Sequence, residues 1–357
     1  MTESAKRIKG RAVVDNPANR FSDTHHEAFD DGWGAQGDES DAPATELIAD
    51  ASRSVLVYNQ SPDVPFDRSV NPYRGCEHGC VYCYARPTHA YLDCSAGLDF
   101  ETMIFYKAGA AELLAQEIGK PGYQCQPIAL GVNTDAYQPA ERKLKITRGI
   151  LEVLLAHRHP VGIVTKSALV ERDLDLLGDM ANRNLVHVMV SVTSLDKRLA
   201  RSMEPRAAAP RRRLESIRRL SAAGIPVGVL VAPVVPVLND GEIESILTEV
   251  RRAGALTAGY VMLRLPHEVK DLFRSWLQRH VPLKADHVMK RIRDIRGGTE
   301  NDSQFGRRMR GTGVYAELSQ KRFEIALARL SFQGMAACDS SCCRVPRTSA
   351  PQLQLFD

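Results

Sequence analysis

Residues 71–91 read NPYRGCEHGCVYCYARPTHAY, and this stretch holds the most informative pattern in the 357-residue chain. Cys76, Cys80 and Cys83 have the spacing C-x3-C-x2-C, and the aromatic residue Tyr82 precedes the last cysteine. Three thiolates on one short loop can ligate three irons of a cubane iron–sulfur cluster and leave the fourth iron without a protein ligand. An open iron of this kind suits the binding and cleavage of a small molecule.

A zinc site is the main alternative for these cysteines. With His78 or His89 they would make a Cys3His set. Zinc sites of that type usually show two short ligand pairs separated by a longer spacer, whereas here all three cysteines fall within eight residues. Unrelated buried thiols are a weaker alternative, because Glu77, His78 and Gly79 make the loop polar. The spacing therefore favours the open-iron cluster.

The composition is that of an ordinary globular protein, with 44% hydrophobic and 25% charged residues. No run of eighteen apolar residues occurs, and the opening MTESAKRIKGRAVVDNP lacks the apolar core of a signal peptide. We therefore expect a cytoplasmic protein without a membrane segment. Eight cysteines in such a protein indicate metal or redox chemistry more than disulfides.

The net charge of +4 is unevenly distributed along the chain. Residues 1–50 contain five Lys/Arg and eleven Asp/Glu, a net charge of −6, so the remainder carries +10. Basic residues cluster at 206–219 and again at 284–310. A basic body of this kind fits a nucleic-acid partner, and DNA is the candidate. The alternative is a set of solvated helix faces.

From about residue 68 onward, short apolar segments alternate with helical patterns, which predicts an α/β fold with a parallel sheet and outer helices. Six such units are fewer than the eight of a closed barrel, so we expect a partial (β/α)6 barrel of the TIM type. In such barrels the chemistry takes place at the carboxyl ends of the strands. The expected strands are 68–73, 127–133, 161–165, 186–193, 226–233 and 260–265, and the expected helices are 108–118, 142–157, 170–182, 211–223, 241–253 and 268–280.

We divide the chain into four regions by composition. Residues 1–54 are acidic and predicted to be mostly disordered, although the basic piece around KRIKGRAVVDNPANRF is a candidate for local docking. The barrel is expected over 55–283. A basic helical extension follows over 284–335, and a flexible tail over 336–357.

The cluster loop resembles that of the radical S-adenosylmethionine (radical SAM) superfamily. The stretch from about residue 55 to 335 further resembles the spore photoproduct lyase-like bacterial subgroup, also described as DNA repair photolyase-like. The cluster loop carries the likeness to the superfamily, and the combination of motifs carries the likeness to the subgroup. Besides the cluster loop, the matching motifs are AGLDFE, TDAYQPAE, VTKS, MEPRAAAPRRRLESI, AGIPVGVLVAPVVPVLND, LRLPHEV and RGGTENDSQFGRRMRGTG.

This resemblance implies a concrete chemistry. A reduced 4Fe-4S cluster held by Cys76, Cys80 and Cys83 would cleave S-adenosylmethionine reductively, and the resulting 5′-deoxyadenosyl radical would abstract hydrogen from a substrate. An electron donor of the flavodoxin or ferredoxin type would supply the electron. Spore photoproduct lyase repairs a thymine dimer in DNA, so a lyase acting on a DNA lesion is the candidate activity.

The resemblance also implies where S-adenosylmethionine binds, because the cluster loop fixes which end of the barrel is active. Polar residues at the carboxyl ends of the second, third and fourth strands are candidates for its amino, carboxylate and ribose groups. Arg206 is a candidate carboxylate clamp, since a guanidinium matches a carboxylate with two hydrogen bonds. The predicted cofactor-binding residues are Tyr82, Asn133, Thr134, Asp135, Lys166, Ser167, Ser191, Thr193 and Arg206.

Lyase chemistry also calls for a hydrogen donor or one-electron relay near the radical. Cys94, Tyr91 and Tyr137 are the candidates in this sequence. A simple packing role for Cys94 is an equal alternative, and for Cys125 we expect packing.

Two features near the C-terminus lie outside the barrel pattern. Cys338, Cys342 and Cys343 form a second group for which an auxiliary cluster, a zinc ion and no metal are the alternatives. We expect no metal, because the number and spacing of ligands are incomplete. The final APQLQLFD resembles the short peptide by which bacterial repair and replication proteins dock in the sliding clamp. Its apolar side chains would enter pockets of that clamp, and a segment folded back on its own core is the alternative. The peptide runs from Gln352 through Leu353 and Leu355 to Phe356.

Three hypotheses for function remain open from the sequence. The first is a radical SAM enzyme acting on DNA, and the second is the same chemistry on RNA, a protein or a small molecule. The third is a non-catalytic, metal-stabilised protein that binds nucleic acid.

Overall fold

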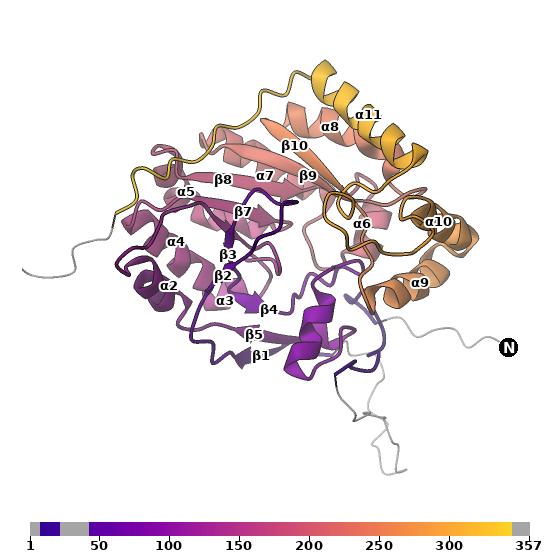
Figure 1. The fold of residues 1–357 in the computed structure, drawn as a ribbon, viewed down its shortest axis with the longest axis horizontal. Helices are drawn as coiled ribbons and strands as arrows, with labels where there is room; N and C mark the ends of the chain where they lie inside the picture. Colours follow the sequence, from indigo (N-terminus) through magenta and orange to yellow (C-terminus); the bar gives the residue numbers. More distant parts are fainter. Residues whose placement is uncertain (1–7, 22–42, 345–357) are drawn as a thin grey trace, which may run out of the picture.

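The structure, a computed structural model, describes residues 8–21 and 43–344. Its main feature is a seven-stranded sheet with the order β10-β9-β8-β7-β6-β3-β2, seen face-on in Figure 1. Neighbouring strands from β3 to β10 are parallel, and only β2 runs antiparallel to its neighbour β3. The predicted partial barrel of six parallel strands is therefore confirmed. The strands of this sheet are β2 (Leu56–Tyr58), β3 (Arg68–Val70), β6 (Ile128–Leu130), β7 (Val161–Thr165), β8 (Val186–Ser191), β9 (Val227–Val234) and β10 (Thr257–Met262).

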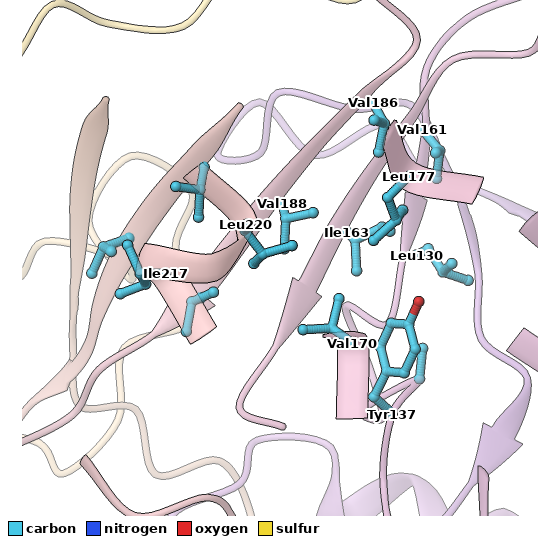
Figure 2. Packing of buried hydrophobic residues seen from close by; sticks show 14 of the residues in the cluster. Leu130, Tyr137, Val161, Ile163, Val170, Leu177, Val186, Val188, Ile217 and Leu220 are labelled. Carbon is cyan, nitrogen blue, oxygen red and sulfur yellow. The ribbon is translucent and has the colours of Figure 1, made fainter. Parts of the chain in front are cut away.

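Helices cover the outer face of this sheet, and the main core lies between the two layers. Every second residue of β7 and β8 is buried there, including Val161, Ile163, Val186 and Val188. Figure 2 shows these valines and isoleucines meeting Leu177 and other apolar residues of the helices. The helices of the barrel region are α2 (Ala110–Ile118), α3 (Glu141–Leu144), α4 (Ile146–Ala156), α5 (Leu174–Ala181), α6 (Lys197–Met203), α7 (Pro210–Ala222), α8 (Ile243–Arg252) and α9 (Val269–His280), with the 3-10 turns η2 (Ala168–Asp173) and η3 (Asp240–Glu242).

Most predicted elements are present, and the differences have local causes. The predicted strand 68–73 ends at Val70, because Pro72 cannot donate to a ladder. The predicted helix 142–157 is divided at Lys145, whose φ of 54° lies in the left-handed region. The sixth strand, β10, begins at Thr257, three residues before the predicted start, because its first residues, Thr-Ala-Gly, carry little apolar signal.

A second, three-stranded sheet was not predicted. It has the order β1-β5-β4 and lies beside the barrel, at the bottom of Figure 1. The strand β1 comes from the segment predicted to be mostly disordered, and it pairs in parallel with β5. Its bounds are β1 (Glu46–Ala49), β4 (Tyr73–Arg74) and β5 (Met103–Tyr106), with η1 (Arg86–Leu92) and α1 (Asp99–Thr102) between β4 and β5.

The C-terminal extension is helical, as predicted, with α10 (Pro282–Asp294) and α11 (Val314–Arg329). The basic loop between these helices returns to the barrel, where the Met262 N–H of β10 donates to the Met309 carbonyl over 2.9 Å. The buried guanidinium of Arg296 fastens this loop by donating to the carbonyls of Leu263 and Arg308. Among the described residues, no helix is long and apolar enough to cross a membrane.

Candidate active site

The cluster loop follows β4, which comes directly after β3. The loop therefore lies at the carboxyl end of the parallel strands. The backbone N–H of Cys76 donates to the Phe100 carbonyl over 2.8 Å, which holds the start of the loop. Gly79 has a φ of 65°, and a Cβ atom there would lie 2.6 Å from the carboxylate of Glu101. The loop therefore needs glycine between its first two cysteines. Cys76 and Cys80 are buried, Cys83 is half-buried, and all three are free thiols.

The three sulfurs are farther apart than the ligands of a single zinc ion would be. They do not all lie within 4.8 Å of one another. Four ligands around a zinc ion, with Zn–S distances of about 2.3 Å, would bring sulfurs to within about 4 Å. The two histidines of the zinc alternative form no ligand group with these cysteines among the described residues. Nδ1 of His78 lies 3.3 Å from Asp135, and His89, whose ring nitrogens have no hydrogen-bond partner there, packs against the rings of Phe100 and Phe105.

A buried ion pair supports the loop from below. The side chains of Arg86 and Glu101 are both fully buried and form a salt bridge. Arg86 also donates to the Cys80 carbonyl over 2.9 Å, so it ties the loop directly to this pair. From the other side, the Ala12 N–H donates to the Glu101 carboxylate, and Arg11 donates to the Glu101 carbonyl over 2.6 Å. The N-terminal residues 11–13 are thus part of the support of the cluster loop.

A second buried carboxylate, Glu204, binds the loop to the barrel. It accepts hydrogen bonds from the hydroxyls of Tyr82 and Thr193 and forms a salt bridge with Arg213. Arg213 in turn donates to the Ser191 carbonyl at the end of β8 over 3.0 Å. The sequence analysis quoted the motif MEPR but selected only its arginine. The sequence signal that was missed is the pairing of Glu204 in that motif with Arg213, nine residues later on α7.

Asp135 links the cluster loop to β6 and β7. One carboxylate oxygen accepts from the Thr165 hydroxyl over 2.8 Å, and the other accepts from the Lys166 N–H over 2.7 Å and faces His78. Burial by itself would raise the pKa of Asp135, but His78 and the backbone N–H groups of Lys166 and Tyr137 lower it to about 2. Both oxygens have protein partners, so Asp135 positions the loop, and its role as a ligand of S-adenosylmethionine stays a prediction.

Burial raises the pKa of all three cluster thiols, so each needs a compensating positive charge or metal to ionise. The protein supplies part of that charge. Lys166 lowers the pKa of both Cys80 and Cys83, and Arg86 and its backbone N–H act on Cys83. The carboxylates of Asp135 and Glu204 act in the opposite direction on Cys76 and Cys80, so a metal has to supply the rest of the charge. Three buried thiols on one short loop are a donor set that fits an iron–sulfur cluster.

The family whose description is "Radical SAM superfamily" matches residues 70–250, from the last residue of β3 through the cluster loop to most of α8. The chain belongs to the radical SAM superfamily. It is accordingly a radical SAM enzyme, a class that uses a 4Fe-4S cluster and S-adenosylmethionine and that needs an electron donor.

Relatives and solved structures of this radical SAM enzyme agree with the fold. Uncharacterized proteins of Mycobacterium bovis and Mycobacterium tuberculosis are each 40% identical over 65% of this chain and 68% of their own length. A mutant of spore photoproduct lyase is similar in structure, with a TM-score of 0.58 and 14% identity over 80% of each chain. Another mutant, with bound AdoMet and dinucleoside spore photoproduct, has a TM-score of 0.53 and 17% identity over 80% of this chain and 78% of that chain.

The other predicted ligands of S-adenosylmethionine in this radical SAM enzyme divide into engaged and available side chains. Thr134 donates to the Tyr73 carbonyl over 2.7 Å, and Thr193 is held by Glu204, so both have structural roles. Ser167 caps η2 by accepting from the Leu169 N–H over 3.2 Å. Within the described part of the chain, no side-chain hydrogen bond engages the three remaining candidates, which stay predicted ligands: Asn133, Lys166 and Ser191.

Arg206 does not have the free position expected of a carboxylate clamp. Its guanidinium pairs with Glu77 over 2.9 Å and donates to the Thr45 hydroxyl over 3.2 Å. Thr45 also donates to Glu77, so the three side chains close the space between the cluster loop and the segment before β1. In the structure Arg206 thus forms a link within the protein, and its role as a carboxylate clamp stays a prediction.

The predicted hydrogen donors are not brought together at the radical SAM site. Tyr91 is 70% exposed and stacks on Phe21. Tyr137 lies in the core between the sheet and the helices, next to Val170 in Figure 2, and does not face the barrel interior. Cys94 contacts the Leu92 carbonyl and the Met103 sulfur, which fits the packing alternative.

The mouth of the barrel carries a cation that the sequence analysis did not select. Arg264 follows the end of β10, and its guanidinium lies 5.5 Å from the ring centroid of Tyr84, the residue after the last cluster cysteine. Tyr84 in turn donates to the Val132 carbonyl at the end of β6. Burial and the nearby Arg308 lower the pKa of Arg264, and Tyr84 and Asp63 oppose that shift. Asp63 forms its salt bridge with Arg308, and no carboxylate in the described ranges forms one with Arg264. The pair of Arg264 and Tyr84 thus links the residue after β10 to the segment that follows β6.

Proposed function

We propose that this radical SAM enzyme acts on a lesion in DNA, with a lyase-type repair similar in class to that of spore photoproduct lyase. The observation that carries the proposal is the unpaired guanidinium of Arg264 at the barrel mouth, beside the cluster loop. A half-buried cation without a carboxylate partner suits an anionic ligand, and nucleic acid presents phosphates in a regular row.

The surroundings of Arg264 strengthen the choice of nucleic acid. The loop between α10 and α11 places the exposed Phe305 near Arg264, since Arg308 acts on Arg264 and lies 4.6 Å from the centroid of the Phe305 ring. The exposed Arg310 of the same loop lies 4.2 Å from the ring centroid of Tyr260 on β10. Exposed aromatic rings beside arginines can stack unpaired bases while the guanidinium groups contact phosphates. A damaged base must leave the helical stack to reach a barrel interior, and such a surface would receive it.

Within this proposal, the residues of the chain divide the work. Cys76, Cys80 and Cys83 would hold the cluster, and Lys166 with Asn133 would orient S-adenosylmethionine. When bound, the cluster and S-adenosylmethionine supply a 5′-deoxyadenosyl radical. The protein aims that radical by fixing the loop through Glu204, and it limits water by burying the cysteines.

Two partners belong to the same proposal. An electron donor of the flavodoxin or ferredoxin type would reduce the cluster. The tail from Gln352 to Phe356, which lies outside the described residues, would dock in the sliding clamp and keep the enzyme on DNA.

The chemistry is tested by anaerobic reconstitution with iron and sulfide, followed by dithionite, S-adenosylmethionine and detection of 5′-deoxyadenosine. We expect production in the wild type and its loss in Cys76→Ala, Cys80→Ala and Cys83→Ala. A protein that yields no 5′-deoxyadenosine above that of these variants would point to the non-catalytic alternative.

The substrate is tested by binding of single-stranded and ultraviolet-damaged duplex oligonucleotides over a series of salt concentrations. We expect the double variant Arg264→Gln/Arg310→Gln to bind more weakly and to reduce the magnitude of the slope of log K against log salt by roughly 1.4 on single strands and 1.8 on duplex. Arg252→Gln/Arg329→Gln is the matched control, because it removes equal charge from exposed positions on outer helices. Equal losses in both variants, or no DNA binding by the wild type, would favour RNA, a protein or a small molecule as substrate.

A further inference from the structure

The segment after α11 crosses the amino-terminal ends of the barrel strands, away from the cluster loop. Its contacts follow the sheet order: the Gly334 N–H donates to the Leu256 carbonyl before β10, and the Asp339 N–H donates to the Asn184 carbonyl before β8. The Arg344 N–H then donates to the His157 carbonyl before β7. Figure 1 shows this yellow segment running along the sheet from α11 towards α4.

This path brings Cys343 to two residues that are distant in sequence. Cys125 precedes β6, His159 precedes β7, and one ligand atom from each of these three residues lies within 4.8 Å of the other two. His159 is fully buried, and the two cysteines are half-buried free thiols. The sequence analysis expected packing for Cys125 and no metal for the C-terminal cysteines, because it compared Cys343 only with its sequence neighbours.

We propose that Cys125, His159 and Cys343 bind a zinc ion that fastens the C-terminal segment to the base of the barrel. Two thiolates and one imidazole are a donor set typical of zinc. The ligands come from three separate segments, so the ion would close a link between the chain end and the starts of β6 and β7. The fourth position of a tetrahedral ion would be filled by solvent.

The surroundings of His159 favour coordination through one ring nitrogen. Nδ1 lies 3.0 Å from the Pro160 carbonyl, a contact that a protonated nitrogen makes, and this leaves the lone pair on Nε2. In the structure Nε2 faces the Tyr123 hydroxyl at 2.9 Å. Zinc would take the lone pair on Nε2, and the Tyr123 hydroxyl would turn to another acceptor.

Two further cysteines of the same segment provide matched controls. Cys338 faces Nδ1 of His187 at 3.4 Å, and the exposed Cys342 faces a carboxylate oxygen of Asp339 at 3.2 Å. Both lie within a few residues of Cys343, but neither is a member of the three-residue set. Their replacement removes a thiol from the segment without removing a proposed ligand.

The test measures zinc in the full-length protein, purified anaerobically and before any iron is added. We expect about one zinc per chain, which also remains in the cluster-free variant Cys76→Ala/Cys80→Ala/Cys83→Ala. Cobalt(II) added in place of zinc should give the visible bands of a tetrahedral site with sulfur ligands. Zinc and these bands should be lost in Cys125→Ala, His159→Ala and Cys343→Ser but kept in Cys338→Ala and Cys342→Ala.

Replacement of the buried His159 could prevent folding, so Cys343→Ser is the decisive variant. Cys343 lies on a surface segment, where a serine is tolerated. Its 5′-deoxyadenosine production should remain, which separates this site from the cluster. Absence of zinc from the reduced wild type, or equal loss in Cys342→Ala, would overturn the proposal. A Cys125–Cys343 disulfide found by peptide mass spectrometry in the anaerobic, metal-free protein would also overturn it and assign the pair to redox chemistry.

Discussion

The hydroxyl of Tyr82 donates to the carboxylate of Glu204, although 122 residues separate the two in the chain. The residue before the last cluster cysteine is thereby fixed by the segment that follows α6. Burial tends to raise the pKa of Glu204, and Arg213 opposes that shift. The loop, the end of β8 and α7 therefore share one buried network.

Replacing Glu204 with glutamine should weaken this network strongly. Arg213 is only 2% exposed, so the variant leaves a buried guanidinium without its counter-charge. We expect a loss of about 3–5 kcal/mol in the free energy of unfolding, measured with urea under anaerobic conditions. Glu215→Gln is the control, since Glu215 pairs with exposed arginines on α7 and should cost less than about 1 kcal/mol. Similar losses in the two variants would contradict the network.

Gly79→Ala should disturb the cluster loop itself. The positive φ disfavours a side chain, and the added Cβ would meet Glu101, which Arg86 holds in place. We expect a loss of about 2 kcal/mol or more, together with less iron per chain after reconstitution. Gly178→Ala on α5 is the control, because a Cβ there meets open space and the substitution should be neutral or slightly stabilising. An equal loss of iron in both variants would contradict a steric clash at Gly79.

Lys166→Met should weaken the binding of S-adenosylmethionine. Its ammonium group lies 6.0 Å from the ring centroid of Tyr82, which precedes the last cluster cysteine. We propose Lys166, which follows the third strand, as the partner of the methionine carboxylate. Loss of one charge-assisted hydrogen bond predicts about 10- to 100-fold weaker binding. The affinity is measured by equilibrium binding of S-adenosylmethionine to the reconstituted enzyme. The control is Lys143→Met, since Lys143 is exposed. Unchanged affinity would remove Lys166 from the ligand set.

The stability of the fold should fall in acid partly because of His89. Burial lowers the pKa of this imidazole to about 4, from an ordinary value near 6.5. The unfolded chain therefore binds a proton first, and stability present above pH 6.5 is lost as the pH falls towards 4, by at most about 3 kcal/mol. In His89→Phe the unfolding free energy should depend less on pH over this interval, whereas replacement of the exposed His267 should leave the slope unchanged. Equal slopes in the wild type and His89→Phe would contradict this assignment.

The repeated strand–helix units of the barrel were predictable from the sequence. β7 was predicted with its observed bounds, because alternating burial gives Val161 and Ile163 a clear apolar pattern. The small sheet was not, since β1 has only four residues and its pairing with β5 depends on contacts between distant segments. The cluster cysteines were predictable because their spacing is local.

The supporting residues of the site were harder to predict because their partners are remote in sequence. The roles of Glu204 in MEPR and of Arg213 on α7 become evident only in the folded barrel, where Glu204 contacts both Tyr82 and Arg213. Asp135 and Arg206 were chosen as ligands from their chemistry, but the fold supplies protein partners for both. Polar residues at strand ends can bind ligands or build the site, and only contacts distinguish these roles.

The buried contacts of the cluster loop also set an order of events during protein synthesis. The contacts of the loop are incomplete when its cysteines leave the ribosome. The partner of Tyr82, Glu204, and its counter-charge Arg213 are translated more than a hundred residues later. Arg11, made first, also remains without its partner until Glu101 has been added. Metal loading of the native loop is therefore an event that follows translation of most of the barrel, and the half-made chain holds its thiols without the surroundings that protect them.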